Sequence, residues 1–125
     1  MSKVAVLKTS PDQVLEDIKT LFKDAEAEKA LNKNKTTILK DNISWHFPYL
    51  SANTTPWQLE GTIQALQQMG YHDISSVHNN TVVTNADKGQ RMNKLKPLYQ
   101  KYEIPEYENF NKKEITWTVF EPQAE

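Results

Sequence analysis

The 125-residue sequence contains no cysteine and only three glycines, and both scarcities narrow the chemistry open to it. Without cysteine, the chain itself cannot form a disulfide, a thiolate zinc site, a cysteine-ligated iron–sulfur cluster or a cysteine nucleophile. Gly61, Gly70 and Gly89 are scattered along the chain, so no glycine-rich phosphate loop is present. The sequence therefore argues against redox chemistry of its own and against dinucleotide or P-loop binding.

The chain also lacks an excess of charge of either sign. Fifteen basic residues balance sixteen acidic ones, which leaves a formal net charge of −1 and no overall field toward nucleic acid or an anionic membrane. A basic stretch at residues 88–101 is diluted by Glu103, Glu106 and Glu108. We interpret that stretch as a solvated helix face and expect no nucleic-acid partner, with RNA binding kept as a weaker alternative.

Long apolar runs are missing as well. No segment approaches the roughly 18 apolar residues of a membrane span. The apolar run at residues 4–7 is shorter than the roughly 7–15 residues of a signal peptide's apolar region. His46, His72 and His78 lack the helical i, i+4 spacing of a metal motif. We expect a cytoplasmic protein with no membrane partner and no metal site.

What the sequence does contain is an alternation of short apolar strands and amphipathic helices, typical of one α/β domain over residues 1–125. The expected strands cover residues 4–7, 36–39, 74–77 and 114–120, and Val82 with Val83 could extend the sheet. The expected helices cover residues 11–31, 56–69 and 88–102. This β-α-β-α-β-α-β order predicts a short, mostly parallel sheet with helices on both faces, in three layers.

Capping chemistry supports two of the expected helix starts. Ser10 and Thr55 are each followed by proline and, three residues after the cap, by glutamine, as in a capping box. Gly70 stands where a left-handed residue ends the second helix. Asn85 offers a cap for the third, which Pro97 must kink or split.

Polar residues follow the second and third expected strands at their carboxyl ends, where open α/β sheets bind ligands. Cation, amide and hydroxyl groups there suit a carboxylate or a phosphate. The candidate ligand-binding residues are Lys40, Asn42, Asn53, Thr54, Thr55 and Asn79, with His46, His78 and Asn80 nearby. Each has a structural alternative, because Thr55 also serves as a helix cap and asparagines favour turns.

The segment at residues 37–42, followed by residues 53–56, 59–63 and 69–77, resembles the opening of the domain-of-unknown-function family numbered 362. In that pattern a strand ends in a Lys-Pro-Asn-like triplet and a threonine caps the next helix; here Asp41 replaces the proline. The resemblance implies the N-terminal portion of a longer protein. Some members carry cysteines that hold iron–sulfur clusters, so such a cofactor would lie beyond this chain.

The sequence leaves two functions open. The first is an N-terminal part of an enzyme-like or redox-associated protein, with an anion-binding crevice at the strand ends. The alternative is a non-catalytic protein-interaction or ligand-binding module, in which the aromatic loop at residues 45–49 docks a partner chain or the rest of the polypeptide.

Overall fold

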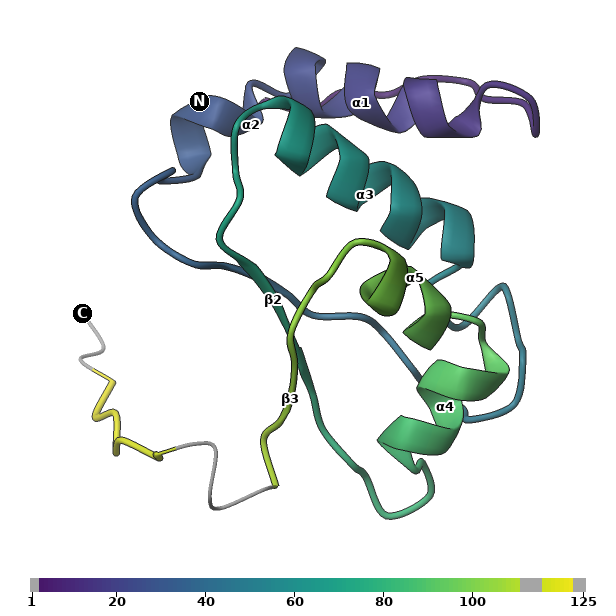
Figure 1. Ribbon diagram of the computed structural model, residues 1–125, viewed down its shortest axis with the longest axis vertical. Helices are drawn as coiled ribbons and strands as arrows, with labels where there is room; N and C mark the ends of the chain where they lie inside the picture. Colours follow the sequence, from purple (N-terminus) through teal and green to yellow (C-terminus); the bar gives the residue numbers. More distant parts are fainter. Residues whose placement is uncertain (1–2, 111–115, 123–125) are drawn as a thin grey trace.

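A computed structural model of the chain describes residues 3–110 and 116–122. Its centre is a three-stranded parallel sheet of β1 (Thr37–Leu39), β2 (Ile74–His78) and β3 (Glu106–Glu108), in the order β1-β2-β3. Figure 1 labels β2 and β3. The expected α/β class with a parallel sheet is confirmed. All three strands end at the same edge, so the residues after β1 and β2 are neighbours.

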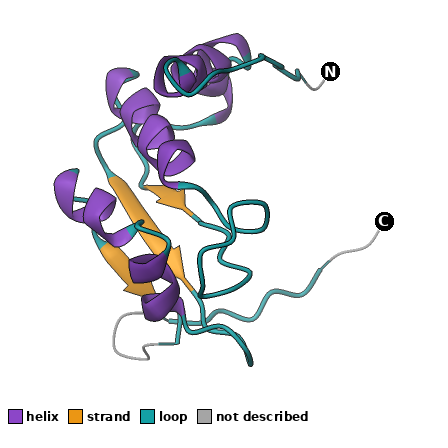
Figure 2. Ribbon diagram, turned by 90° about the vertical axis from the view of Figure 1, so that its right-hand side faces the viewer, coloured by secondary structure: helices purple, strands orange, loops and turns teal. Residues whose placement is uncertain are grey.

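In the described part of the chain five helices accompany the sheet: α1 (Val14–Asp24), α2 (Ala27–Ala30), α3 (Pro56–Gln68), α4 (Ala86–Met92) and α5 (Lys96–Lys101). Helix α3 connects β1 to β2, and α4 with α5 connects β2 to β3. Helix α1 packs on α3 rather than on the sheet, as Figures 1 and 2 show from two sides. The element order is therefore α-α-β-α-β-α-α-β.

Helix α3 begins as its sequence predicts. The Thr55 hydroxyl accepts a hydrogen bond from the Gln58 backbone N–H at 3.4 Å, and the Gln58 side chain accepts one from the Thr55 N–H at 3.0 Å. Pro56 occupies the first turn, where its missing N–H costs nothing. Gly70 ends the helix region with φ 87°, a left-handed conformation that favours glycine.

The core lies on one face of the sheet. Leu39 and Ile74 project to that face and pack with residues of α3 and α5, among them Leu66 and Tyr99. On the opposite face Ile38 is 61% exposed and Tyr107 is 40% exposed, so no described helix forms the expected third layer there. The strand order accounts for this, because right-handed crossovers that advance in one direction place their helices on one face.

The expected N-terminal strand is wrong. Residues 4–7 form no strand, and Val4 and Val6 are 81% and 90% exposed. The segment leads into α1, which lies over α3 and away from the strand edges. The predicted Ser10 cap is also wrong: α1 starts after Gln13 without a side-chain cap, and the Ser10 carbonyl accepts from the Gln13 N–H in a turn.

Two of the expected helices are each divided into two helices. The first is interrupted at Glu26, whose φ of 55° places it in the left-handed region between α1 and α2. The third is split rather than kinked: Lys94 has φ 61°, and Pro97 lies in the first turn of α5. Proline is tolerated there because the first N–H groups of a helix have no intrahelical partner.

The C-terminal expectation differs from the structure too. The third strand is β3, which the sequence does not predict, since Glu106, Tyr107 and Glu108 show no apolar run. Of the expected strand at 114–120, residues 114 and 115 lie outside the described residues, and residues 116–120 form no strand. Val82 and Val83 are exposed in a bend and do not extend the sheet.

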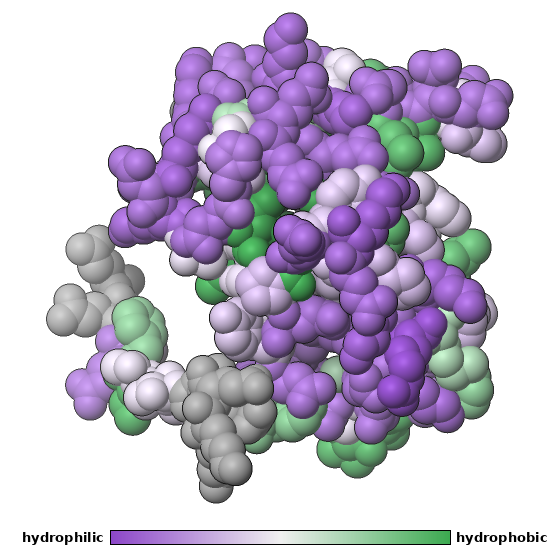
Figure 3. All heavy atoms as spheres, viewed as in Figure 1, coloured by the Kyte–Doolittle hydropathy of each residue, from purple (hydrophilic) through white to green (hydrophobic). Residues whose placement is uncertain are grey.

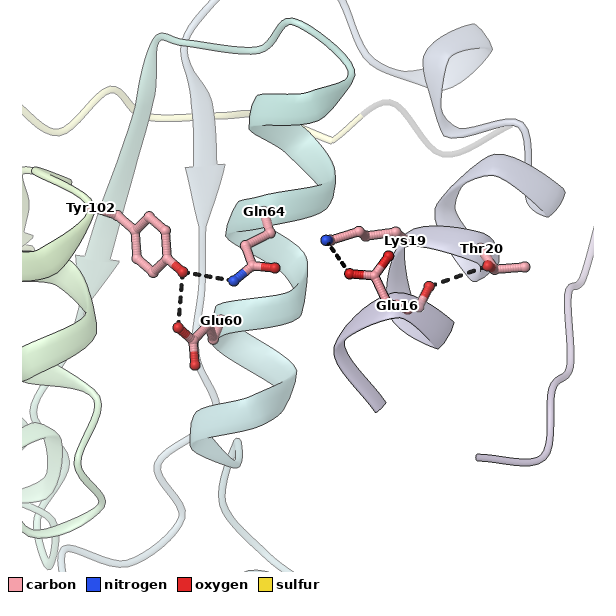
Figure 4. A network of polar contacts seen from close by, with 6 residues as sticks. All are labelled: Glu16, Lys19, Thr20, Glu60, Gln64 and Tyr102. Carbon is pink, nitrogen blue, oxygen red and sulfur yellow. Dashed lines mark hydrogen bonds and ion pairs between the residues drawn. The ribbon is translucent and has the colours of Figure 1, made fainter. Parts of the chain in front are cut away.

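Polar contacts hold α3 against the end of α5. The Tyr102 hydroxyl donates to Glu60 at 2.8 Å and accepts from the Gln64 amide at 2.8 Å (Figure 4). Lys101 pairs with Glu60 at 2.6 Å, which lowers the pKa of that carboxyl.

The side of the molecule viewed in Figure 3 is mostly hydrophilic. No described helix combines the length and apolar character that crossing a membrane requires.

Candidate functional site

A cavity of about 240 Å³ lies at the carboxyl ends of β1 and β2, and we call it the crevice cavity. Lys40, Asp41 and Asn42 line it from the end of β1, and His78 and Asn79 line it from β2. The loop before α4 closes another side. The cavity therefore lies where parallel strands and their following loops gather polar groups.

Three of the six candidate residues line this cavity: Lys40, Asn42 and Asn79. The other three have roles within the fold. Asn53 is buried and donates to the carbonyls of Trp45 and Phe47 at 2.9 and 3.1 Å, which holds the aromatic loop.

The remaining two residues support the loop and the helix. The Thr54 hydroxyl accepts from the Asn42 N–H at 2.9 Å, so it ties the two ends of the loop together. Thr55 caps α3 and does not line the cavity. The start of α3 therefore does not contribute to the cavity lining, although it lies close along the chain.

Lys40 is the cation of the cavity. Within residues 3–110 and 116–122, its ammonium group donates one hydrogen bond, to the Asp41 backbone carbonyl at 2.9 Å. A lysine ammonium has three donors, so two remain for water or a ligand. The Asn42 amide, in contrast, already donates to the Ala52 carbonyl at 2.6 Å and to the Ser44 hydroxyl at 3.0 Å, and it shapes the loop.

A chain of buried side chains lies behind the cavity. The Tyr99 hydroxyl of α5 donates to the Asp41 carboxylate, and the Ser76 hydroxyl of β2 lies 3.0 Å from the Tyr99 oxygen. Ser76 Oγ in turn lies 2.7 Å from Nε2 of His78. We call these four residues the buried chain; each is at most 5% exposed.

Burial sets the protonation of the buried chain. Burial, with a smaller contribution from the charge of Lys40, lowers the pKa of His78 from 6.5 to about 4, so the imidazole is neutral at neutral pH. Burial also raises the pKa of Asp41, against the opposing effects of the Tyr99 hydrogen bond and of Lys40. Burial and the Asp41 charge both raise the pKa of Tyr99, which keeps its proton.

The sequence alone identifies this site in part. Ser76 and His78 lie two residues apart on β2, so the two-residue period of a strand places both side chains on one face. Asp41 shows no sign of its inward orientation. Tyr99 meets Asp41 from 58 residues away, a contact that no local pattern encodes.

The larger grooves of the molecule lie elsewhere, and they are less suited to binding a small polar ligand than the crevice cavity. Two grooves of about 600 Å³ each flank α1, one beside Lys19 and Lys23 and the other beside Pro11 and Trp57. They are larger but lie away from the strand ends, and Lys19 is paired with Glu16 at 2.6 Å. Within residues 3–110 and 116–122, no group of three or more potential ligands could hold a metal ion.

Comparison of the chain with protein-family models, with curated proteins and with solved structures finds no match.

Proposed function

We propose that this chain is a ligand-binding α/β unit whose crevice cavity takes a small anion, a carboxylate or a phosphate. The observation that carries this proposal is the single cavity shared by Lys40, His78 and Asn79 at the carboxyl ends of two parallel strands. The resemblance to family 362 supports the further proposal that the unit serves a larger, enzyme-like or redox-associated protein in the cytoplasm.

Size and charge favour a small ligand. A cavity of about 240 Å³ is below the roughly 300–1,000 Å³ of pockets that take drug-sized molecules. Lys40 supplies the positive charge and two N–H donors, and a charge-assisted hydrogen bond is roughly twice as strong as a neutral one. The Asp41 carboxylate opposes an anion, but it points to Tyr99.

The test is a titration of the purified chain with inorganic phosphate and with acetate, followed by calorimetry at constant ionic strength. Lys40→Ala should weaken binding of either anion by about tenfold or more, since a hydrogen bond to a charged group contributes about 1.5–3 kcal/mol. Lys35→Ala is the matched control, because Lys35 is an exposed lysine in the turn before β1. Equal binding by wild type and Lys40→Ala would contradict the proposal.

A second candidate function rests on the aromatic loop. Trp45 stacks on His46 with ring centroids 4.5 Å apart, and Trp45, Phe47 and Tyr49 are all exposed. Exposed aromatic residues on an ordered loop favour a protein-interaction module. If the partner is a second copy of this chain, sedimentation velocity should show association that Tyr49→Ser abolishes; association unchanged in that variant would count against this loop.

Absence of a nucleic-acid partner also remains a proposal. Arg91 and Lys96 pair with Asp87 at 2.6 and 3.2 Å, and Lys101 pairs with Glu60. These pairs offset the basic stretch, and this supports weak or absent binding. Steeply salt-dependent, submicromolar binding of single-stranded RNA would contradict it.

A further inference from the structure

The hydrogen bonds of the buried chain can be assigned donors and acceptors one after another, beginning with the bond to Asp41. Each hydroxyl has one proton to donate, so a hydroxyl that donates in one hydrogen bond of the buried chain must accept in the next. Tyr99 gives its proton to the carboxylate of Asp41. The Tyr99 oxygen can therefore only accept in its contact with Ser76 at 3.0 Å.

The same reasoning continues from Ser76 to His78. If the Ser76 proton pointed to His78, two oxygen atoms would face each other at 3.0 Å with no proton between them. Ser76 therefore donates to Tyr99, with the Leu39 carbonyl as a second acceptor at 3.4 Å. Its oxygen must then accept from Nε2 of His78 at 2.7 Å. A neutral imidazole with a protonated Nε2 has a lone pair on Nδ1.

Nδ1 is the ring nitrogen of His78 that the contact with Ser76 leaves for a ligand in the crevice cavity, which this residue lines. Among the described residues it has no hydrogen-bond partner, and the polar side-chain atom that is fully buried without a partner is Nδ1 of His46 instead. His78 is 2% exposed overall and lines the cavity. Water in the cavity can therefore pair with this acceptor, and a ligand that displaces the water but cannot donate to Nδ1 leaves it unpaired.

We propose that His78 presents an unprotonated Nδ1 to the crevice cavity, and that the cavity selects an anion that carries a proton to donate. This inference rests on the proposed anion-binding function and specifies its ligand class. Lys40 alone cannot distinguish an anion with a proton from one without, because its ammonium group attracts either anion by charge. Hydrogen phosphate and sulfate carry the same double charge and a similar tetrahedral shape, but only hydrogen phosphate has an O–H to donate.

The experiment compares inorganic phosphate with sulfate by calorimetry at about pH 8, where phosphate is mainly the dianion, at constant ionic strength. We expect wild type to prefer phosphate by about tenfold or more, since an unpaired buried acceptor costs about 1–3 kcal/mol. His78→Phe, which removes both ring nitrogens, should abolish the preference. His72→Phe is the matched control, because His72 is exposed and lies before β2.

A second measurement does not depend on a ligand or on the folding of a variant. Long-range proton–nitrogen correlation spectra of the wild-type imidazoles report which ring nitrogen carries the proton. We expect the Nε2–H tautomer for His78. An Nδ1–H tautomer would overturn the inference, and so would equal affinity for phosphate and sulfate, although equal affinity would leave anion binding itself intact. Failure of both ions to bind would instead contradict the proposed function, and the ligand selection with it.

Discussion

Acidification should destabilise this fold through His78. The pKa of His78 is about 4 in the folded chain, whereas an unperturbed histidine has 6.5. Between these two values the unfolded chain binds more protons than the folded chain, so the free energy of unfolding rises with pH. The stabilising contribution of neutral His78 is fully present above about pH 6.5 and is lost as the pH falls to about 4.

The magnitude follows from the two pKa values. A gap from 6.5 to about 4, at about 1.4 kcal/mol per pKa unit, corresponds to about 3 kcal/mol. Because His78 borders a cavity that admits solvent, screening reduces this to about 2 kcal/mol. Asp41 acts in the opposite direction: burial raises its pKa, so its contribution to the free energy of unfolding falls as the pH rises above 3.8.

A difference measurement separates these two contributions. Urea unfolding of wild type and His78→Gln should be followed at several pH values between 4 and 7. Glutamine does not titrate, and its amide can still donate to Ser76. The gap in free energy of unfolding between wild type and variant should change by about 2 kcal/mol over this interval. Parallel pH profiles for the two proteins would refute the reasoning.

Three further substitutions test the packing by urea unfolding. Thr55→Ala should lower the free energy of unfolding by about 1 kcal/mol, through loss of the α3 cap; no change would contradict the capping role. Gly61→Ala should cost about 1 kcal/mol, because its methyl group would lie 2.6 Å from Ile18 Cδ1 and overpacking of about 1–3 kcal/mol exceeds the helix gain. Ile18→Ala in the same chain should relieve part of this cost, since it removes Cδ1 but keeps Cβ, which lies 3.0 Å from the methyl group. Tyr99→Phe should cost about 2 kcal/mol near pH 7, and less once Asp41 is protonated, because the buried carboxylate loses its donor; an equal cost at both pH values would argue against this cause.

The parts of the fold that the sequence predicts are those that local chemistry determines. The α3 start needs only Thr55, Pro56 and Gln58, and all three act as their spacing indicates. The run at residues 4–7 has the composition of a strand, but a strand also needs a partner edge, and nothing in four residues specifies one. Strand β3 is the converse case: it pairs with β2 without an apolar pattern of its own.

Prediction of the site follows the same division. Lys40 and Asn79 are predictable because parallel strands end at one edge, so consecutive strand ends converge. Asn53 is chemically plausible as a ligand, yet the structure uses its amide inside the aromatic loop and against Asn93 at 2.9 Å. The contacts of Tyr99 depend on how α5 packs, which the sequence does not reveal.

Asp41 is the residue of the buried chain on which the order of its hydrogen bonds depends. Here a carboxylate is buried at 5% exposure, and its raised pKa means that its ionised form costs stability. A cost of this kind is typical of functional positions rather than of packing. An ionised Asp41 is the acceptor that orders the proton of Tyr99 and, through Ser76, the tautomer that His78 presents to the crevice cavity.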